Sequence, residues 1–299
     1  MMTEERAWPG NPLQVLSGFF SSYAELTKLR LVSLVLMSAA AGYFLAPDFP
    51  NKWESFLHVL FATGLVAAGS QTLNQWLERD YDALMPRTAR RPIPTGRVKP
   101  SHALIAGIFL SVIGLFFLWK TSNTLTVILG AVTLASYLIF YTPLKRITSL
   151  NSIAGAVPGA IPPMMGWTAV TGRLDFEAWV LFAILFLWQM PHFLAIAWLY
   201  REEYYKAGFV MLSGDGSNSG MVARQAVLYA AMLLPVSLVP TLCGMSGKIY
   251  FFSALALGIF LLRASAACLS GMDNKARPLL RASILYLSLL LLIMAVDKV

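Results

Sequence analysis

Long runs of apolar residues set the strongest limit on how this 299-residue chain can fold. In a bilayer every backbone polar group must find its partner within the protein, so an apolar run of about 20 residues is expected to form a membrane-spanning helix. Only 13% of the residues are charged, against about 25% in a typical soluble domain. We therefore predict an all-α, polytopic membrane protein with about nine transmembrane helices. The expected spans are 31–47, 54–73, 102–119, 124–141, 151–170, 177–199, 222–243, 249–269 and 279–296.

Lysine and arginine residues are distributed unevenly between the two sides that these spans define. If the N-terminus is cytoplasmic, 18 of the 23 basic residues fall on the cytoplasmic side and five on the other. Cytoplasmic segments of membrane proteins are enriched in Lys and Arg. We therefore expect residues 1–27 to be a cytoplasmic segment without a cleaved signal peptide, and the C-terminus to lie across the membrane. This topology explains the net charge of +8, which gives no support for nucleic-acid binding.

The two longest polar loops, 74–101 and 201–221, both fall on the predicted cytoplasmic side of a single domain that covers 1–299. Each loop begins with acidic residues at the end of a span. In the second loop these are Glu202 and Glu203. The recurrence of acids at one membrane face predicts that both loops contribute to one site.

The first acidic group has a helical spacing. Asn74, Glu78 and Asp82 are four residues apart, so they share one face if the preceding helix continues through them. Asp80 then points nearly the opposite way, and it joins the others only where the helix unwinds. The first three are therefore the stronger candidates for a shared site.

Carboxylates that lie close together repel one another unless a cation separates them. Mg²⁺ is commonly bound by one or two carboxylates together with substrate phosphates, and arginine suits phosphate recognition. Basic residues follow the first acidic group closely: Arg87, Arg90, Arg91, Arg97 and Lys99. This combination favours a site for Mg²⁺ and a diphosphate. The alternative is that the acids only cap a helix end and pair with arginines, which themselves serve topology and lipid contact.

Two features inside the predicted spans also suggest function. His192 lies in the sixth span directly after Pro191; ionisable residues within membranes usually face the bundle interior, and imidazole is a common ligand of heme iron. The alternative is a hydrogen-bonded packing residue. The stretch 156–167 contains three prolines and two glycines. Broken backbone at membrane depth must line a cavity or pack on protein, so we expect it to border a central pocket.

Four stretches resemble a known family, the intramembrane prenyltransferases of the UbiA superfamily. They are NQWLERDYD (74–82) with RTARRPIPTGRV (87–98), YTPLKRITSLNSIAGAVPGAIPPMMGW (141–167), WQMPHFLAIAW (188–198) and REEYYKAGFVML (201–212). YTPLKR and WQMPHF are similar to the heme O synthase branch of the superfamily. The chain departs from the family pattern where Glu203-Tyr204 replaces an Asp-Tyr pair, and Glu78 stands where Asp is common.

The resemblance implies a ring of helices around a central cavity and transfer of a farnesyl group from farnesyl diphosphate to a vinyl group of heme B, with Mg²⁺ as cofactor. It also implies a bacterial inner-membrane location. The Mg²⁺ ligands that it implies are Asn74, Glu78, Asp80, Asp82, Glu202 and Glu203. The residues implied to bind the diphosphate are Arg87, Arg91, Lys145 and Arg146. The residues implied to contact the farnesyl cation or the heme are Tyr141, His192, Trp198, Arg201 and Tyr204.

Two other functions compete with this interpretation. The first is a related prenyltransferase that acts on an aromatic or quinone-precursor acceptor, which would carry the same acidic motif but lack YTPLKR and WQMPHF. The second is a transporter with broken helices and ionisable residues at the membrane midplane. The acids here cluster at one membrane face, which argues against a transporter.

Overall fold

The computed structural model describes residues 12–47, 49 and 53–299, with side chains from Ser17 onward. This part of the chain is helical, and its β-structure is a single isolated bridge between Ser246 and Lys298. The helices are α1 (Pro12–Leu26), α2 (Leu29–Leu45), α3 (Trp53–Asp82), α4 (Pro100–Thr121), α5 (Thr124–Ala135), η1 (Ser136–Tyr141), α6 (Thr142–Leu144), α7 (Asn151–Ala160), α8 (Pro162–Thr171), α9 (Phe176–Leu199), α10 (Arg201–Lys206), α11 (Ser219–Val236), α12 (Val239–Leu242), α13 (Lys248–Ala266), η2 (Ala267–Ser270) and α14 (Ala276–Val296).

The prediction of an all-helical membrane protein is confirmed, although the count of nine separate spans is not. Within the described residues, seven helices are long and apolar enough to cross a membrane, or eight if α1 and α2 form one span bent by 54°. The predicted fifth span is divided into α7 and α8, two helices of ten residues each. Pro162 and Pro163 begin the second half, and because proline lacks a backbone N–H, the helix is interrupted before them.

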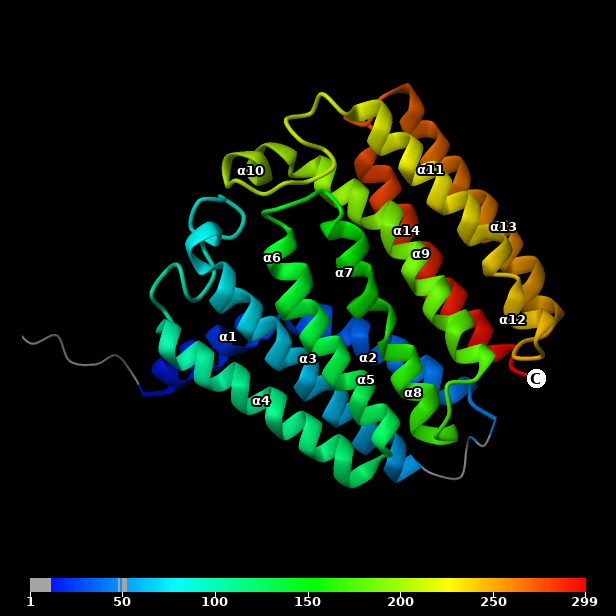
Figure 1. The fold of residues 1–299 in the computed structure, drawn as a ribbon, viewed down its shortest axis with the longest axis horizontal. Coiled ribbons are helices and arrows are strands. Elements are labelled where there is room, and N and C mark those ends of the chain that lie inside the picture. Colours follow the sequence, from blue (N-terminus) through cyan, green and yellow to red (C-terminus); the bar gives the residue numbers. More distant parts are fainter. Residues whose placement is uncertain (1–11, 48, 50–52) are drawn as a thin grey trace, which may run out of the picture.

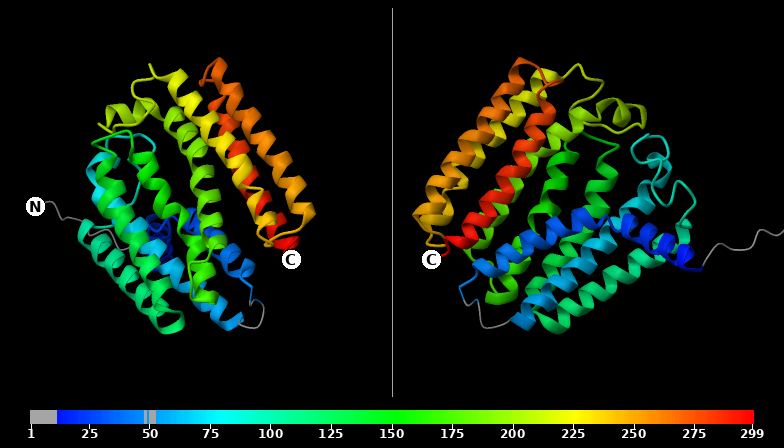
Figure 2. Two further views of the ribbon diagram at one scale, coloured as in Figure 1. Left: turned by 45° about the vertical axis from the view of Figure 1, so that its right-hand side comes forward. Right: turned by 180° about the vertical axis from the view of Figure 1, so that it is seen from behind.

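The long helices lie side by side, and the loop after α3 and helix α10 gather at one end of the bundle (Figures 1 and 2). Helix α9 packs against α7, α11 and α14, and the largest cluster of buried apolar side chains lies among α9, α11, α13 and α14. On the other side α2 approaches α8 closely, because Gly42 rests against the Pro163 carbonyl, where a β-carbon would clash. These contacts fix the helices that surround the site.

Helix α3 is 30 residues long, about ten more than a helix needs to cross the hydrocarbon core. Its last three turns carry a buried polar face formed by Gln71, Asn74, Gln75, Glu78 and Asp82. Polar groups are buried only where they find partners. The extension of α3 therefore presents a line of amides and carboxylates to the neighbouring segments.

The C-terminus closes the opposite end of the bundle. The ammonium group of Lys298 donates hydrogen bonds to the carbonyls of Phe44, at 2.7 Å, and Ala46, at 2.8 Å. These carbonyls belong to the C-terminal end of α2, where the last backbone acceptors of a helix lack helical partners. The first long helix is thus tied to the residues that follow the last one.

Candidate active site

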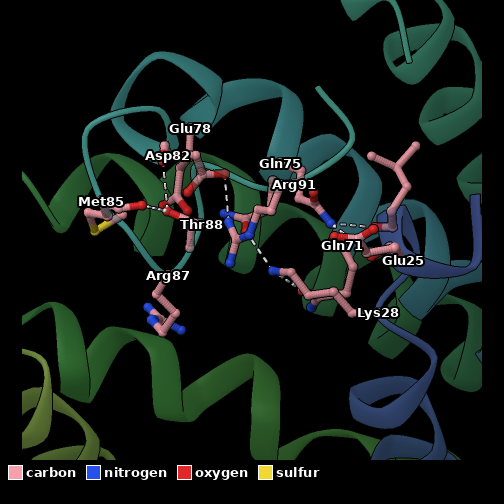
Figure 3. Close-up of polar contacts among 12 residues, drawn as sticks. Glu25, Lys28, Gln71, Gln75, Glu78, Asp82, Met85, Arg87, Thr88 and Arg91 are labelled. Carbon is pink, nitrogen blue, oxygen red and sulfur yellow. Dashed lines mark hydrogen bonds and ion pairs between the residues drawn. The ribbon is translucent and has the colours of Figure 1, made fainter. Parts of the chain in front are cut away.

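The two buried carboxylates at the end of α3 each meet one cation. The Oδ2 atom of Asp82 lies 2.6 Å from Nη1 of Arg91, and Oε1 of Glu78 lies 2.7 Å from Nζ of Lys145. Figure 3 shows both acids on the same face of α3, with Arg91 folding back towards them from the following loop. Close charge pairs of this kind are expected where burial makes an uncompensated carboxylate costly. The face predicted from the four-residue spacing is therefore formed.

Asn74 extends this polar face by one turn. Its Oδ1 accepts a hydrogen bond from Lys28 at 3.3 Å, and its Nδ2 donates to Oγ1 of Thr142 at 3.2 Å. The Thr142 hydroxyl in turn donates to the carbonyl of Tyr137, five residues earlier. The backbone N–H of Thr142 donates to the same carbonyl and ends η1, a single π-helical turn. Such turns are frequent at functional sites.

Lys28 is a site residue that the sequence prediction missed. It lies between α1 and α2 with a φ of 51°, and within the described residues it is the one non-glycine residue with a positive φ. Its ammonium donates to Oε1 of Gln71 at 3.0 Å as well as to Asn74. Figure 3 shows Lys28 beside Gln71. Burial, together with the nearby Arg91, lowers the pKa of Lys28 to about 7. A lysine rarely adopts this backbone conformation without a compensating contact.

Lys145 and Arg146 come to the acidic face from the segment after α6. Lys145 lies 4.5 Å from the ring centre of Tyr141, and Arg146 lies 4.3 Å from that of Tyr81. Burial alone would lower the pKa of Lys145, but the Glu78 carboxylate together with Tyr141 and Tyr137 outweighs this effect, and the pKa is raised. Lys145 is therefore held as a cation beside an aromatic face.

Arg87 joins the two polar loops. Its backbone N–H donates to Oε2 of Glu203 at 3.2 Å, and its guanidinium donates to the Tyr204 hydroxyl at 3.1 Å. The same guanidinium lies 4.6 Å from the ring centre of Tyr200. The structure thus brings Glu203 and Tyr204 of α10 against the loop that follows α3, as the recurrence of acids predicted.

Two predicted metal ligands lie apart from this arrangement. Helix α3 stays regular through Asp82, so Asp80 points away from Asp82, has a side chain that is 75% exposed and lies 3.6 Å from Arg79. The unwinding that Asp80 required is absent from this structure. Glu202 is exposed on α10. Over the described ranges, no three His, Cys, Asp or Glu side chains are gathered closely enough to hold a metal ion.

Trp198 and Arg201 belong to a separate cluster around Asp273, a residue that the sequence prediction did not include. The Trp198 indole donates to Oδ1 of Asp273 at 3.1 Å, and Arg201 lies 3.0 Å from the same oxygen. The guanidinium of Arg201 also lies 4.6 Å from the centre of the indole ring. Trp198 is only 2% exposed. The structure therefore places both residues at the junction of α9, α10 and the segment before α14.

A small cavity lies beside the ion pairs. It is lined by Tyr141, Asn151, Ser152, Phe193, Ile196, Ala197, Tyr204 and Met211. Two of the predicted substrate-contacting residues, Tyr141 and Tyr204, therefore face the same space. His192 lies on α9 one turn before Ile196, where it bonds to Ser283 of α14 at 2.9 Å and stacks on Trp188.

Comparison with known proteins identifies the family. The profile of the UbiA prenyltransferase family matches residues 35–290. The chain belongs to the UbiA prenyltransferase family. It is 46% identical over 286 residues to a protein of Solibacter usitatus named protoheme IX farnesyltransferase, with 92% of this chain and 98% of that protein covered. A protein of Koribacter versatilis with the same name is 41% identical, with 96% of each chain covered.

Solved structures share the fold of this UbiA family member. A digeranylgeranylglyceryl phosphate synthase structure matches with a TM-score of 0.79 at 17% identity, covering 93% of this chain and 98% of that one. A UbiA homolog from Archaeoglobus fulgidus bound to GPP and Mg²⁺ matches with a TM-score of 0.65 at 13% identity, covering 89% and 99%. These likenesses establish the arrangement of the helices around the site.

The donor set on α3 fits a hard cation. Asn74, Glu78 and Asp82 supply amide and carboxylate oxygens, the ligands that Mg²⁺ takes. The Oδ1 atom of Asp82 is buried and has no hydrogen-bonding partner among the described residues. A buried carboxylate oxygen without a partner is rare in proteins, and a bound cation would satisfy it. The residues present on α3 are therefore compatible with the Mg²⁺ that the family resemblance implies.

Proposed function

We propose that this chain transfers a farnesyl group from farnesyl diphosphate to a vinyl group of heme B, giving heme O. The names of the relatives at 41–46% identity support this substrate pair. The observation that carries the proposal in the structure is the pairing of two buried carboxylates, Glu78 and Asp82, with Lys145 and Arg91. A buried mixture of acids and cations at the end of a membrane-spanning helix fits a ligand that is itself a metal–anion pair.

The charges in the site balance such a ligand. Arg91 and Lys145 pair with the two carboxylates, Asp82 and Glu78, and Lys28, whose pKa burial lowers to about 7, would take up a full positive charge beside a bound anion. A fully ionised diphosphate ester with one Mg²⁺ carries a single net negative charge, which the third cation neutralises. When it is bound, Mg²⁺ supplies Lewis-acid stabilisation to the leaving diphosphate. The site would then hold the complex without an uncompensated buried charge.

The residues of this chain would exchange partners when the substrate enters. Asn74, Glu78 and Asp82 would turn their oxygens to the cation, which frees Lys145 and Arg91 for the phosphate oxygens. Arg87 and Arg146 belong to the same two segments as Arg91 and Lys145, and their guanidinium groups lie against Tyr204 and Tyr81. Positive groups fixed where negative charge develops are usually the largest contribution to catalysis. Departure of the diphosphate breaks the C–O bond and leaves its electron pair on oxygen.

Tyr141 and Tyr204 would receive the organic part of the reaction. Both rings line the cavity beside Lys145, and aromatic faces stabilise a cation such as the farnesyl carbon that loses diphosphate. Apolar neighbours including Phe193 and Met211 exclude water. The vinyl π electrons of the acceptor would then form a bond to the allylic carbon, and the cation left on the carbon next to the porphyrin ring would be captured by one water, which loses a proton to give the hydroxyl of heme O. His192 directly precedes Phe193, which lines this cavity, and is the proposed contact for the heme.

The proposed orientation places the site at the cytoplasmic face of a bacterial inner membrane, with Mg²⁺ as the cofactor. The excess of basic residues in loops 74–101 and 201–221 supports this orientation. The C-terminus lies at the end of the bundle away from α10 (Figure 1), which agrees with a C-terminus across the membrane. The proposal assigns both loops to the active site.

The test is an assay of the purified protein with heme B, farnesyl diphosphate and Mg²⁺, analysed by mass spectrometry. The expected product is heme B plus one farnesyl group and one water. Omission of Mg²⁺ is expected to stop its formation. Parallel reactions contain a phenolic acid acceptor in place of heme. Prenylation of the phenol with no modified heme would overturn the proposal in favour of an aromatic prenyltransferase.

A further inference from the structure

The hydrogen bonds around His192 determine which ring nitrogen carries the proton. The hydroxyl of Ser283 lies 2.7 Å from the carbonyl of Leu280, three residues earlier on α14, and donates its only hydrogen to it. The same Oγ atom lies 2.9 Å from Nδ1 of His192. The Leu280 carbonyl can only accept and is the nearer of the two groups, so we assign the hydroxyl hydrogen to it and take Ser283 as the acceptor of the second bond. His192 therefore carries its proton on Nδ1, and Nε2 keeps a free lone pair.

The orientation of the ring is fixed independently of this bond. The imidazole stacks on the indole of Trp188, with ring centres 5.0 Å apart and planes inclined by 26°. The indole N–H of Trp188 donates to the backbone carbonyl of Ser283 at 2.6 Å. Two contacts to one residue of α14 thus hold the ring and its stacking partner. A histidine that only fills space between helices would not need both its ring and its stacking partner bonded to the same residue.

The Nε2 nitrogen is the second polar atom of the His192 ring. Among the described residues none forms a hydrogen bond with Nε2 of His192, and the residue is only partly buried. Phe193 and Ile196, which follow it on α9, line the cavity beside the ion pairs. A polar atom left without a partner within the membrane is unfavourable unless a ligand supplies one. The arrangement therefore points to a ligand for Nε2.

We propose that Ser283 is a positioning residue that holds His192 in the tautomer whose Nε2 binds the iron of the heme substrate. A ligating histidine usually donates its other N–H to an oxygen acceptor, which sets the tautomer and the ring orientation. Neutral imidazole is a common axial ligand of heme iron. This inference rests on the proposed function, because it assumes that the acceptor is heme. It adds to the proposed function that Nε2 of His192 binds the heme iron and that Ser283 sets the tautomer of His192.

The test compares four variants with the wild-type protein. Ser283→Ala removes the acceptor of the histidine proton but keeps the backbone carbonyl to which Trp188 bonds. Ser283→Thr retains a hydroxyl that can bond back to its own helix. His192→Ala removes the ligand. Ser265→Ala is the matched control, since Ser265 is also fully buried in a spanning helix and donates to its own helix, at the Leu261 carbonyl.

Ferric heme B is titrated into each purified protein and followed by absorption and electron paramagnetic resonance. The wild-type protein is expected to give the spectrum of a histidine ligand, and His192→Ala to lose it until imidazole is added. Ser283→Ala should weaken heme binding about 10–100-fold, the usual effect of losing the partner of a ligating histidine. Ser283→Thr and Ser265→Ala should stay close to the wild type. The KM for farnesyl diphosphate should not change in any variant.

Two outcomes would overturn the inference. One is a histidine-ligated spectrum that persists in His192→Ala. The other is a Ser283→Ala variant that binds heme as Ser265→Ala does, or that is weakened no more than Ser283→Thr. The wild-type assay separates these results from failure of the proposed function. A wild-type protein that makes heme O while His192→Ala retains its iron ligand contradicts only the role of His192 and Ser283.

Discussion

At the scale of single residues, the site is a set of buried charges that compensate one another. Glu78 and Asp82 are each within 2.7 Å of a cation. Removing one member of a buried pair leaves the other uncompensated, which is strongly destabilising. Substitutions that keep the shape but change the charge therefore have to be compared with neighbours that lie outside the cluster. Asp82 and Asp80 offer such a comparison within a single turn.

Asp82→Asn is expected to lower the rate of prenyl transfer by at least about 10²-fold, the effect of losing one preorganised electrostatic contact. The amide keeps the volume of the carboxylate but contributes no charge to Mg²⁺ or to Arg91. Asp80→Asn is the control, because that side chain is 75% exposed, and it should retain nearly full activity. Turnover by purified protein with a normal thermal unfolding curve is the measurement. Equal loss in both variants would contradict the assignment of the α3 face.

Lys28→Gln should raise the KM for farnesyl diphosphate by about 10–100-fold, because a hydrogen bond to a charged group contributes about 1.5–3 kcal/mol. The variant retains a polar side chain near Gln71 and Asn74 but not the positive charge. Arg30→Gln is the control, since Arg30 is exposed two residues later. Steady-state kinetics with heme held at saturation provide the test. An unchanged KM in Lys28→Gln would remove Lys28 from the diphosphate site.

Sequence analysis identified residues that are related by local helical spacing. It missed residues that reach their partners only through the folding of distant parts of the chain. Asn74, Glu78 and Asp82 were predictable because a helix repeats every 3.6 residues. Lys28 was not predictable, because it reaches the site through a backbone turn with a φ of 51°, and no local sequence pattern predicts that turn. Asp273 was missed for a similar reason, since its partners Trp198 and Arg201 are more than 70 residues away in the chain.

At the scale of helices, the site depends on short irregular elements between long regular ones. The π-helical turn η1 places Thr142 against Asn74, and the six-residue helix α10 carries Glu203 to the backbone of Arg87. The long helices were visible in the sequence as apolar runs. These short elements carry no periodic signal of their own, so only contacts in the folded chain define them.

Glu203→Gln tests whether α10 helps to complete the metal site. We expect this substitution to raise the Mg²⁺ concentration needed for half-maximal activity several-fold, because the carboxylate that faces the first loop loses its charge. Glu202→Gln changes the adjacent, exposed residue in the same way and should leave the Mg²⁺ dependence unchanged. Activity is measured over a Mg²⁺ titration at saturating substrates. Identical curves for the two variants would show that α10 closes the site without contributing to metal binding.

At the scale of the whole molecule, hydropathy predicted the helical bundle but not how its ends are joined. All nine apolar runs are helical, yet the first is preceded by a bent helix and the fifth is broken before Pro162. The breaks follow from proline chemistry and from tertiary packing of α2 against α8. At the C-terminal end, Lys298 bonds to the end of α2, a contact that the charge count from the sequence did not predict.

Lys298→Met is expected to loosen the bundle far from the active site. The ammonium donates to two carbonyls at the end of α2, those of Phe44 and Ala46. Because the position is partly exposed, we expect the substitution to lower the free energy of unfolding by about 1–2 kcal/mol. In detergent this should lower the Tm by about 2–6 °C, while the KM values for both substrates stay unchanged. Lys248→Met, at an exposed lysine near the same end, is the matched control. A Tm that falls equally in the two variants would mean that general surface charge, and not the contact with α2, holds this end together.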